Sequence, residues 1–189
     1  MVRVFIAVEV EDLNTLKRII DIKNRVNACS SYIDLKAVED ENLHMTLRFI
    51  GEVNEHLIND ITNVLQCVSN FKRFSIRFRG VGAFPSVGRP RVIWLGVSEG
   101  SNQLKLIRDC IEKGLRRLGF QPEKEEFTPH LTLARVKEFK PSRCLSELFA
   151  ELNDVDVGPS PVTKVKLKKS TLTPKGPIYS DLFEVLLAD

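Results

Sequence analysis

The chain has 189 residues, of which 43% are hydrophobic and 28% charged, with a formal net charge of +3. The interspersed charges and the apolar content exclude a disordered chain and fit one domain with a substantial core. No apolar run approaches the roughly 20 residues that span a bilayer, and the apolar start at residues 2–8 is too short for a secretory signal. We therefore expect a cytoplasmic protein.

The first half of the chain predicts three strands and two helices. An apolar run over residues 2–10 is typical of a strand covered on both faces. Apolar side chains at helical spacing from Leu13 to Val26 predict a helix. A strand over residues 44–50, a helix over 57–68 and an alternating strand over 74–79 follow.

The second half repeats this order. The predicted elements are a strand over 91–97, a helix capped by Ser101, a strand over 130–136, a short helix starting at Ser142, and strands over 162–172 and 181–187. Glycine and proline clusters at 80–90 and 158–161 predict loops. We predict one domain, residues 1–189, built from two similar halves of about 1–85 and 86–189. A duplicated unit tends to assemble about a pseudo-twofold axis, so equivalent strands should face each other across a groove.

Two of the three histidines occupy the same setting. The sequence His-x-Thr-Leu begins at His44 and again at His130. Alternate residues of a strand share one face, so each imidazole lies beside a hydroxyl, that of Thr46 or of Thr132. The intervening residues, Met45, Leu47 and Phe49 on the first strand and Leu131 and Leu133 on the second, are expected to face apolar packing. His56 has no partner threonine and is interpreted as structural.

Two imidazoles and two hydroxyls suit the opening of a cyclic phosphate. Histidine titrates at about pH 6.5, so one ring can accept a proton from water while the other protonates the leaving oxygen. Threonine hydroxyls can donate hydrogen bonds to the non-bridging phosphate oxygens. A two-histidine metal site is the alternative, but no carboxylate or cysteine stands at a spacing that would complete it. We expect no metal and no cofactor.

The four cysteines are widely separated, with no C-x-x-C pair. Cys67 and Cys110 lie among apolar helical positions, which favours buried free thiols. An internal disulfide stays open as the alternative, because some thermophile proteins carry disulfides in the cytoplasm.

Four segments resemble the two-histidine (2H) phosphoesterase superfamily, and within it the RNA 2′,3′-cyclic phosphodiesterases, also called 2′-5′ RNA ligases. The paired histidine motifs span residues 41–53 and 127–135. The likeness extends to residues 90–97 and 173–179 and so covers nearly the whole chain.

The resemblance implies an α+β fold in which two pseudo-symmetric lobes of antiparallel sheet, with helices on their outer faces, form a central groove. It implies metal-independent hydrolysis of RNA 2′,3′-cyclic phosphate ends to 2′-phosphomonoesters, with reversible 2′-5′ ligation as a related activity. His44 would be the proton donor, His130 the proton acceptor, and Thr46 and Thr132 would bind the phosphate. The expected partner is RNA with such an end, tRNA-like fragments included; we expect a monomer and no membrane.

Further substrate contacts are expected from five residues: Arg135, Arg48, Phe84, Arg91 and Tyr179. The family places a basic residue at Arg135, although strict alternation puts it on the opposite face from His130; a bulge or a strand end would reconcile the two. Arg48 shares the face of His44 by alternation. Phe84 lies beside arginines, as suits an unpaired base, with ordinary loop packing as the alternative.

Two other features bear on the RNA. Lys164, Lys166 and Lys168 alternate along one strand face, where a solvated edge is favoured over a binding track. Ala37 stands where many relatives carry an aromatic residue, which argues against base stacking at that position.

Two other functions fit the sequence. One is a related phosphodiesterase for another substrate, such as a 2′-5′ oligonucleotide or a small cyclic nucleotide. The other is a non-catalytic RNA-binding module, which would bind RNA without hydrolysing it.

Overall fold

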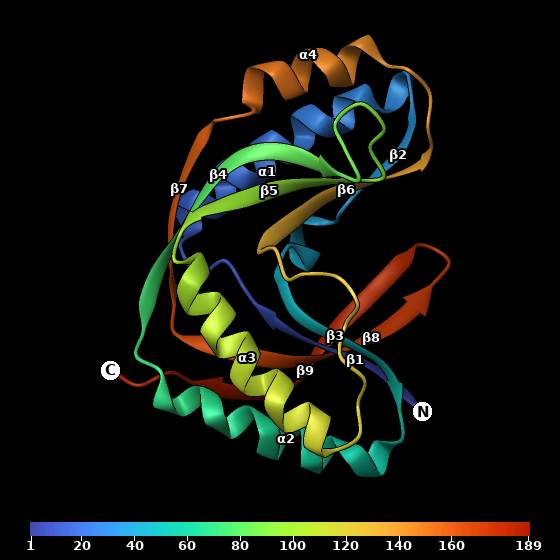
Figure 1. The fold of residues 1–189 in the computed structure, drawn as a ribbon. Coiled ribbons are helices and arrows are strands. Elements are labelled where there is room, and N and C mark those ends of the chain that lie inside the picture. The colour runs from blue at the N-terminus through green and yellow to red at the C-terminus, as the bar shows by residue number, and fades with distance from the viewer.

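The chain forms two antiparallel sheets, shown in Figure 1 from a computed structural model that describes residues 1–189. The first sheet has the order β3 (Met45–Val53), β1 (Val2–Val8), β8 (Lys164–Thr173) and β9 (Gly176–Leu186). The second has the order β2 (Asp34–Ala37), β6 (His130–Glu138), β5 (Val92–Glu99), β4 (Phe74–Phe84) and β7 (Asp156–Val162). The predicted α+β class with two antiparallel sheets is confirmed.

Helices cover the outer faces of both sheets (Figure 1). Helices α1 (Leu13–Asn27) and α4 (Arg143–Leu152) pack on the second sheet, and α2 (Ile58–Leu65) and α3 (Ser101–Arg117) lie against the first. The helix predicted to start at Ser142 begins one residue later, and the Ser142 hydroxyl caps it by accepting a hydrogen bond from the Leu145 amide. The cap predicted at Ser101 is wrong, because this residue is already helical and Gly100 precedes it with φ +83°. None of the helices is both long and apolar enough to span a bilayer.

Each sheet contains strands from both halves of the chain. In the first sheet, β1 lies between its own histidine strand β3 and β8 from the second half. In the second sheet, β5 lies between its own histidine strand β6 and β4 from the first half. Four strands are thus exchanged, β2 and β4 from the first half and β8 and β9 from the second, so the lobes do not coincide with residues 1–85 and 86–189.

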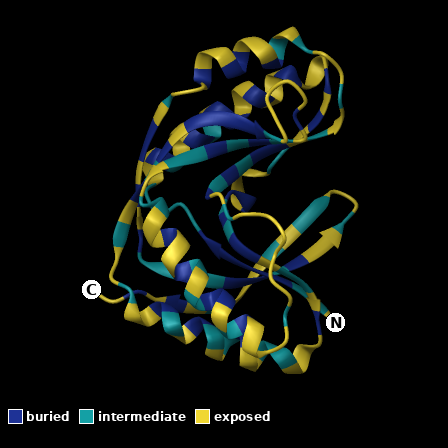
Figure 2. Cartoon of the chain, viewed as in Figure 1, coloured by how far each residue is buried: buried dark blue, intermediate teal, exposed yellow.

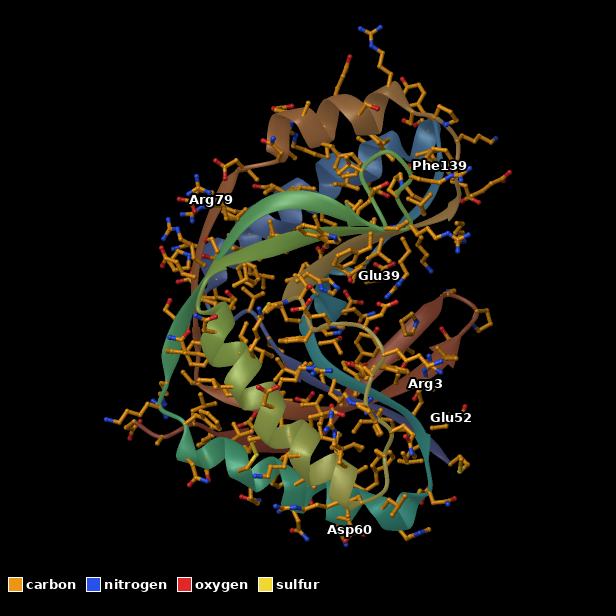
Figure 3. The ribbon with its side chains drawn as sticks, in the orientation of Figure 1. Arg3, Glu39, Glu52, Asp60, Arg79 and Phe139 are labelled. Carbon is orange, nitrogen blue, oxygen red and sulfur yellow. A yellow bond between two sulfur atoms is a disulfide. The ribbon has the colours of Figure 1, made fainter.

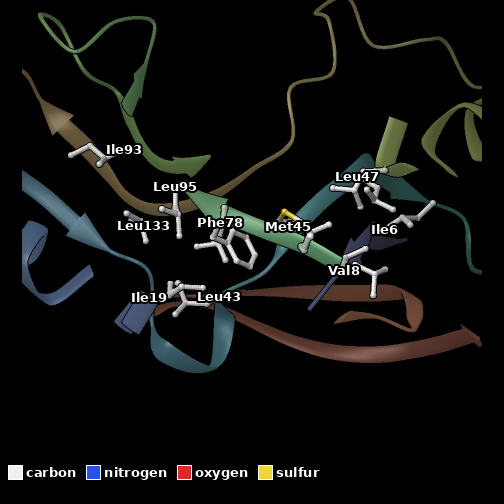
Figure 4. Close-up of a cluster of buried hydrophobic side chains, with 14 of the residues drawn as sticks. Ile6, Val8, Ile19, Leu43, Met45, Leu47, Phe78, Ile93, Leu95 and Leu133 are labelled. Atoms are coloured by element: carbon white, nitrogen blue, oxygen red, sulfur yellow. The ribbon is translucent and has the colours of Figure 1, made fainter. Parts of the chain in front are cut away.

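One apolar core joins the two lobes. Buried side chains of both sheets form a single cluster, which includes Met45 and Leu47 behind one histidine strand and Leu133 behind the other (Figure 4). Yellow exposed residues in Figure 2 gather on the outer faces of the helices. The apolar rear face predicted for the two histidine strands therefore exists at these positions.

The loops predicted at the two glycine–proline clusters are partly strand. Residues 158–161 belong to β7, which pairs only with β4 at the edge of the second sheet. An edge strand tolerates proline because its missing amide can face away from the ladder. Likewise β4 continues to Phe84, so the loop after it is shorter than predicted.

The cysteines form two disulfides, Cys29–Cys144 and Cys67–Cys110. The expectation of free thiols at Cys67 and Cys110 is therefore wrong. The bonded residues are 115 and 43 positions apart, and the fold brings them together at the helices. Cysteine spacing alone carries no signal for such long-range pairs. Each disulfide lies within one lobe, and neither crosses between the two sheets.

Reduction should lower the thermal stability substantially. Closing loops of 115 and 43 residues constrains the unfolded chain by about 5 and about 4 kcal/mol in the chain-entropy model. We expect reduction to lower Tm by roughly 10 °C or more for each disulfide. Calorimetry with and without a phosphine reductant measures this, with Cys67→Ser/Cys110→Ser and Cys29→Ser/Cys144→Ser variants separating the two bonds. Equal Tm values with and without reductant would contradict the pairing.

Candidate active site

A cavity of about 640 Å³ lies between the two sheets. Six of the residues singled out from the sequence line it: His44, Thr46, His130, Thr132, Arg135 and Tyr179. His44 and Thr46 come from β3 and the residue before it, and His130 and Thr132 from β6. The volume falls in the range of small-ligand sites, so the two imidazoles share one nucleotide-sized space.

Both imidazoles are held in the same way. The Nδ1–H of His44 donates to the carbonyl of Asn42 at 2.6 Å, and that of His130 to the carbonyl of Thr128 at 2.7 Å. A carbonyl can only accept, so each bond places the proton on Nδ1 and leaves Nε2 available. The Nε2 of His44 lies 3.0 Å from the Thr46 hydroxyl, which confirms that the two share one face.

Aromatic rings surround both histidines. His44 packs against Phe5 and Tyr179, with ring centroids 5.0 and 5.4 Å away. His130 packs edge to face against Phe84 at 5.0 Å. Burial lowers the pKa of both imidazoles below the usual histidine value, the neighbouring carbonyls oppose the change, and the charge of Arg135 adds to it. For His44, Lys168 also lowers the pKa and Glu9 raises it. Near neutrality the free site therefore favours neutral rings.

A bulge interrupts each histidine strand at the same place. On β3, Ala7 of β1 faces Thr46 and Ile6 faces Arg48, so Leu47 is the extra residue. On β6, Trp94 of β5 faces Thr132 and Ile93 faces Ala134, which makes Leu133 the extra residue. One added residue reverses the alternation of all that follow.

The bulge in β6 explains Arg135. This side chain returns to the face of His130 and Thr132 and lines the cavity, as a bulge was expected to allow. The equivalent position on β3 is Phe49, which also lines the cavity and is 40% exposed. The expectation that Phe49 packs in the interior is therefore wrong for the same reason.

The bulge in β3 turns Arg48 away from the cavity, so its predicted substrate contact is wrong. Arg48 is 6% exposed and lies beneath the sheet. Its Nε donates to Glu112 of α3 at 2.7 Å, and its other nitrogens donate to the carbonyls of Phe49 and Gln121. Arg48 thus joins β3 to α3.

The structure does not bring Phe84 or Arg91 to the cavity wall. Phe84 lies between the rings of His130 and Trp94, the latter at 5.3 Å, so it packs in the protein, as the alternative interpretation held. Arg91 is exposed just before β5. His56 is exposed in a 3₁₀ turn, Glu55–Leu57, away from the cavity.

The three alternating lysines of β8 are paired with acids, which agrees with the favoured interpretation that they are not a binding track. Lys166 lies 2.7 Å from both Glu9 and Asp181, and Lys168 lies 3.0 Å and 3.2 Å from the same two carboxylates. Lys164 lies 3.7 Å from Glu184.

Several cavity residues were not predicted. They are Arg3, Phe5, Lys36, Glu39, Asn42, Phe49, Lys137, Ser170, Leu172 and Lys175. Arg3 and Glu39 are labelled in Figure 3 on opposite sides of the opening between the sheets. Most come from β1, β2 and the β8–β9 hairpin, and these segments carry no histidine motif.

Asn42 connects the hairpin to His44. Its amide Nδ2 donates to the Pro177 carbonyl at 3.0 Å, while its main-chain carbonyl accepts from the His44 imidazole.

No group of three or more His, Cys, Asp or Glu side chains is arranged to hold a metal ion.

The family model of the 2′-5′ RNA ligase superfamily matches residues 20–170. The chain belongs to this superfamily. Members similar to it include a protein from Aeropyrum pernix, 49% identical over 82% of this chain and 88% of the relative, and one from Archaeoglobus fulgidus, 42% identical over 95% and 97%. Both are named RNA 2′,3′-cyclic phosphodiesterase.

Solved structures agree with the superfamily fold. The crystal structure of TT0787 from Thermus thermophilus superposes with a TM-score of 0.80 at 27% identity, covering 97% of both chains. The apo structure of E. coli LigT gives a TM-score of 0.73 at 20% identity, covering 100% of this chain and 98% of that one.

The aromatic packing predicts separable histidine titrations. We expect both imidazoles to titrate below about pH 6.5, because burial disfavours their charged forms. Phe84→Ala should raise the pKa of His130 by letting water reach the ring, while His44, on the other sheet, serves as the internal control. NMR titration of the ring resonances measures both. An unchanged His130, or an equal rise in both, would contradict the packing argument.

The position of Arg48 predicts a loss of stability on its replacement. Arg48→Met should lower the free energy of unfolding by about 3–5 kcal/mol, because Glu112 would be left buried with only Arg108, 3.9 Å away, as a counter-charge. The double variant Arg48→Met/Glu112→Leu should recover most of this loss in urea unfolding. If the single variant were as stable as the wild type but bound substrate more weakly, Arg48 would instead be a substrate-binding residue.

Proposed function

We propose that this protein hydrolyses RNA 2′,3′-cyclic phosphate ends to 2′-phosphomonoesters by acid–base catalysis with His44 and His130. The observation that carries the proposal is the pair of imidazoles on one cavity, each with Nδ1 bonded to a carbonyl, while Nε2 is unbonded in His130 and contacts only the Thr46 hydroxyl in His44. The names of the similar A. pernix and A. fulgidus proteins support the same activity.

Each imidazole carries out one proton transfer in this mechanism. His130 accepts a proton on Nε2 from the attacking water, whose oxygen bonds to phosphorus. As the bond between phosphorus and the 3′ oxygen breaks, His44 gives its Nε2 proton to that oxygen. The products are a 2′-phosphate and a free 3′-hydroxyl, and the two rings then exchange a proton with solvent to return to their starting states.

The remaining cavity groups hold the phosphate. Thr46 and Thr132 donate hydrogen bonds to the non-bridging oxygens, and Arg135 balances the negative charge that grows in the transition state. The lowered pKa of His130 suits a base that must be neutral near pH 7. His44 must be charged, and the bound phosphate anion favours its proton, as does Glu9. Tyr179 packs against His44 and borders the substrate.

The proposal includes the reverse reaction. Attack of a 5′-hydroxyl end on the cyclic phosphate would use the same groups and give a 2′-5′ linkage, because both directions share one transition state. We propose further that the protein acts as a cytoplasmic monomer on RNA fragments and needs no metal.

Single replacements of the histidines test the mechanism. His44→Ala and His130→Ala should each lower kcat by about 10²–10⁴-fold, because each removes one positioned proton transfer. The kcat/KM of the wild type should follow a bell-shaped pH profile. Tm should change little in either variant, and Thr62→Ala on the distant helix α2 is the control. Near-wild-type turnover by either histidine variant would refute its assigned role.

Product analysis tests the substrate class. A short RNA ending in a 2′,3′-cyclic phosphate, incubated with a chelator present, should yield only the 2′-phosphate end. Faster turnover of a 2′-5′ oligonucleotide or a small cyclic nucleotide would favour the related phosphodiesterase. Binding without turnover would favour the RNA-binding module, and loss of activity with chelator would overturn metal independence.

A further inference from the structure

The wall of the cavity carries more positive charge than one phosphate requires. Five basic side chains line it, namely Arg3, Lys36, Arg135, Lys137 and Lys175, and Glu39 is the one acidic side chain among the lining residues. None of the five cations lies within 4 Å of a carboxylate. Cations that converge on a concave surface without counter-charges favour an anionic ligand there.

The charges are distributed unevenly along the first sheet. At the end near Ala7, Lys166 and Lys168 are both neutralised by Glu9 and Asp181. Ionic contacts with these two acids raise the pKa of Lys166, so this pairing persists at neutral pH. The cavity-lining cations of the first sheet, Arg3 beside Ser170 and Lys175 in the β8–β9 turn, have no acid partner, which gives the cavity an electrostatic direction from the histidines toward that hairpin.

The unpaired cations continue in that direction from the histidines. Along β6, the residues on the cavity wall are His130, Thr132, then, after the bulge, Arg135 and Lys137. Two strand residues span roughly 7 Å, so Lys137 lies about one phosphate-to-phosphate step of an extended RNA strand beyond Arg135. Lys36 of β2 is the direct partner of Arg135 in the sheet.

A hydrogen bond joins the third lysine to this group. The ammonium of Lys36 donates to the carbonyl of Lys175 at 2.9 Å, which fixes the hairpin tip against β2. Lys36, Lys137 and Lys175 therefore line the same cavity from β2, β6 and the β8–β9 turn, and the first and last of them are in direct contact. All three are exposed, and lysine ammonium groups on flexible stems bind phosphate as point charges.

We propose that Lys36, Lys137 and Lys175 form a binding subsite for the phosphate on the 5′ side of the terminal nucleotide. This inference rests on the proposed function, because it assumes that the cyclic phosphate lies between the histidines. A 2′,3′-cyclic phosphate occupies both the 2′ and the 3′ oxygen of the terminal ribose, so the RNA continues only through the 5′ oxygen. The phosphate on this 5′ oxygen is therefore the anionic group of the RNA that lies nearest to the cyclic phosphate. The preferred substrate is therefore a cyclic-phosphate end that carries a 5′-phosphate or a preceding nucleotide, over the bare cyclic nucleoside phosphate.

Equilibrium binding tests the subsite without turnover. Calorimetry should show that the wild type binds adenosine 2′,5′-bisphosphate about tenfold more tightly than adenosine 2′-monophosphate, as one charge-assisted contact would give. Lys137→Ala/Lys175→Ala should abolish this difference and leave binding of the monophosphate within twofold. Lys36 stays in place because it also holds the hairpin. The matched control is Lys105→Ala, which removes an exposed, unpaired lysine of α3 outside the cavity.

Salt dependence and turnover complete the test. The bisphosphate should lose affinity more steeply with salt than the monophosphate, and only in proteins that keep the three lysines. The corresponding cyclic compounds should show the same preference in kcat/KM. Equal affinities for the two nucleotides in the wild type, or an equal loss for both in the double variant, would overturn the subsite. Failure to hydrolyse any cyclic compound would overturn the proposed function instead, while the binding comparison would still decide the subsite.

Discussion

The site depends on one repeated interaction, the hydrogen bond from each imidazole Nδ1 to the carbonyl two residues before it. This bond uses only the local backbone, so it forms wherever the strand begins in that conformation. It fixes the tautomer, stops the ring from rotating and aims Nε2 into the cavity. The aromatic rings packed on both histidines then exclude water, which tunes the proton affinity of Nε2. Chemistry that needs two imidazoles in defined states thus relies on main-chain geometry repeated in the two lobes.

The sequence predicted the parts of the molecule that local patterns encode. Alternation and helical spacing located most elements, and the repeated His-x-Thr-Leu setting identified His44 and His130 as a pair. Strict alternation failed at Arg48 and Phe49, because a single inserted residue has no local signature yet reverses every later side chain. Phe84 could not be placed from its arginine neighbours, since its contacts come from a different strand. The disulfides and the cavity lysines were missed because they depend on segments that meet only in the folded chain.

Whether a lysine near the cavity can bind an anion depends on whether an acidic side chain already neutralises it, and not on how many lysines there are. The alternating lysines of β8 look like a basic strand in the sequence, but Glu9, which follows β1, and the acids of β9 neutralise them. Lysines at the hairpin have no such partners, although nothing in their sequence setting distinguishes them. Net charge of the whole chain is therefore a poor guide to where a polyanion binds, and the pairing of each cation is the informative quantity. Asn42 and Lys36 hold the hairpin against the rest of the cavity, so the same contacts shape both the catalytic and the basic part of the wall.

The exchange of strands between the two halves of the chain affects how the protein folds. Neither half of the chain contains a complete sheet, so an isolated fragment ending near residue 85 would expose unpaired strand edges and half of the core. The pairing of β1 with β8 joins residues more than 150 positions apart, and such distant closure slows folding in general. The two lobes are therefore bound to each other as one cooperative unit, and their histidines stay opposed.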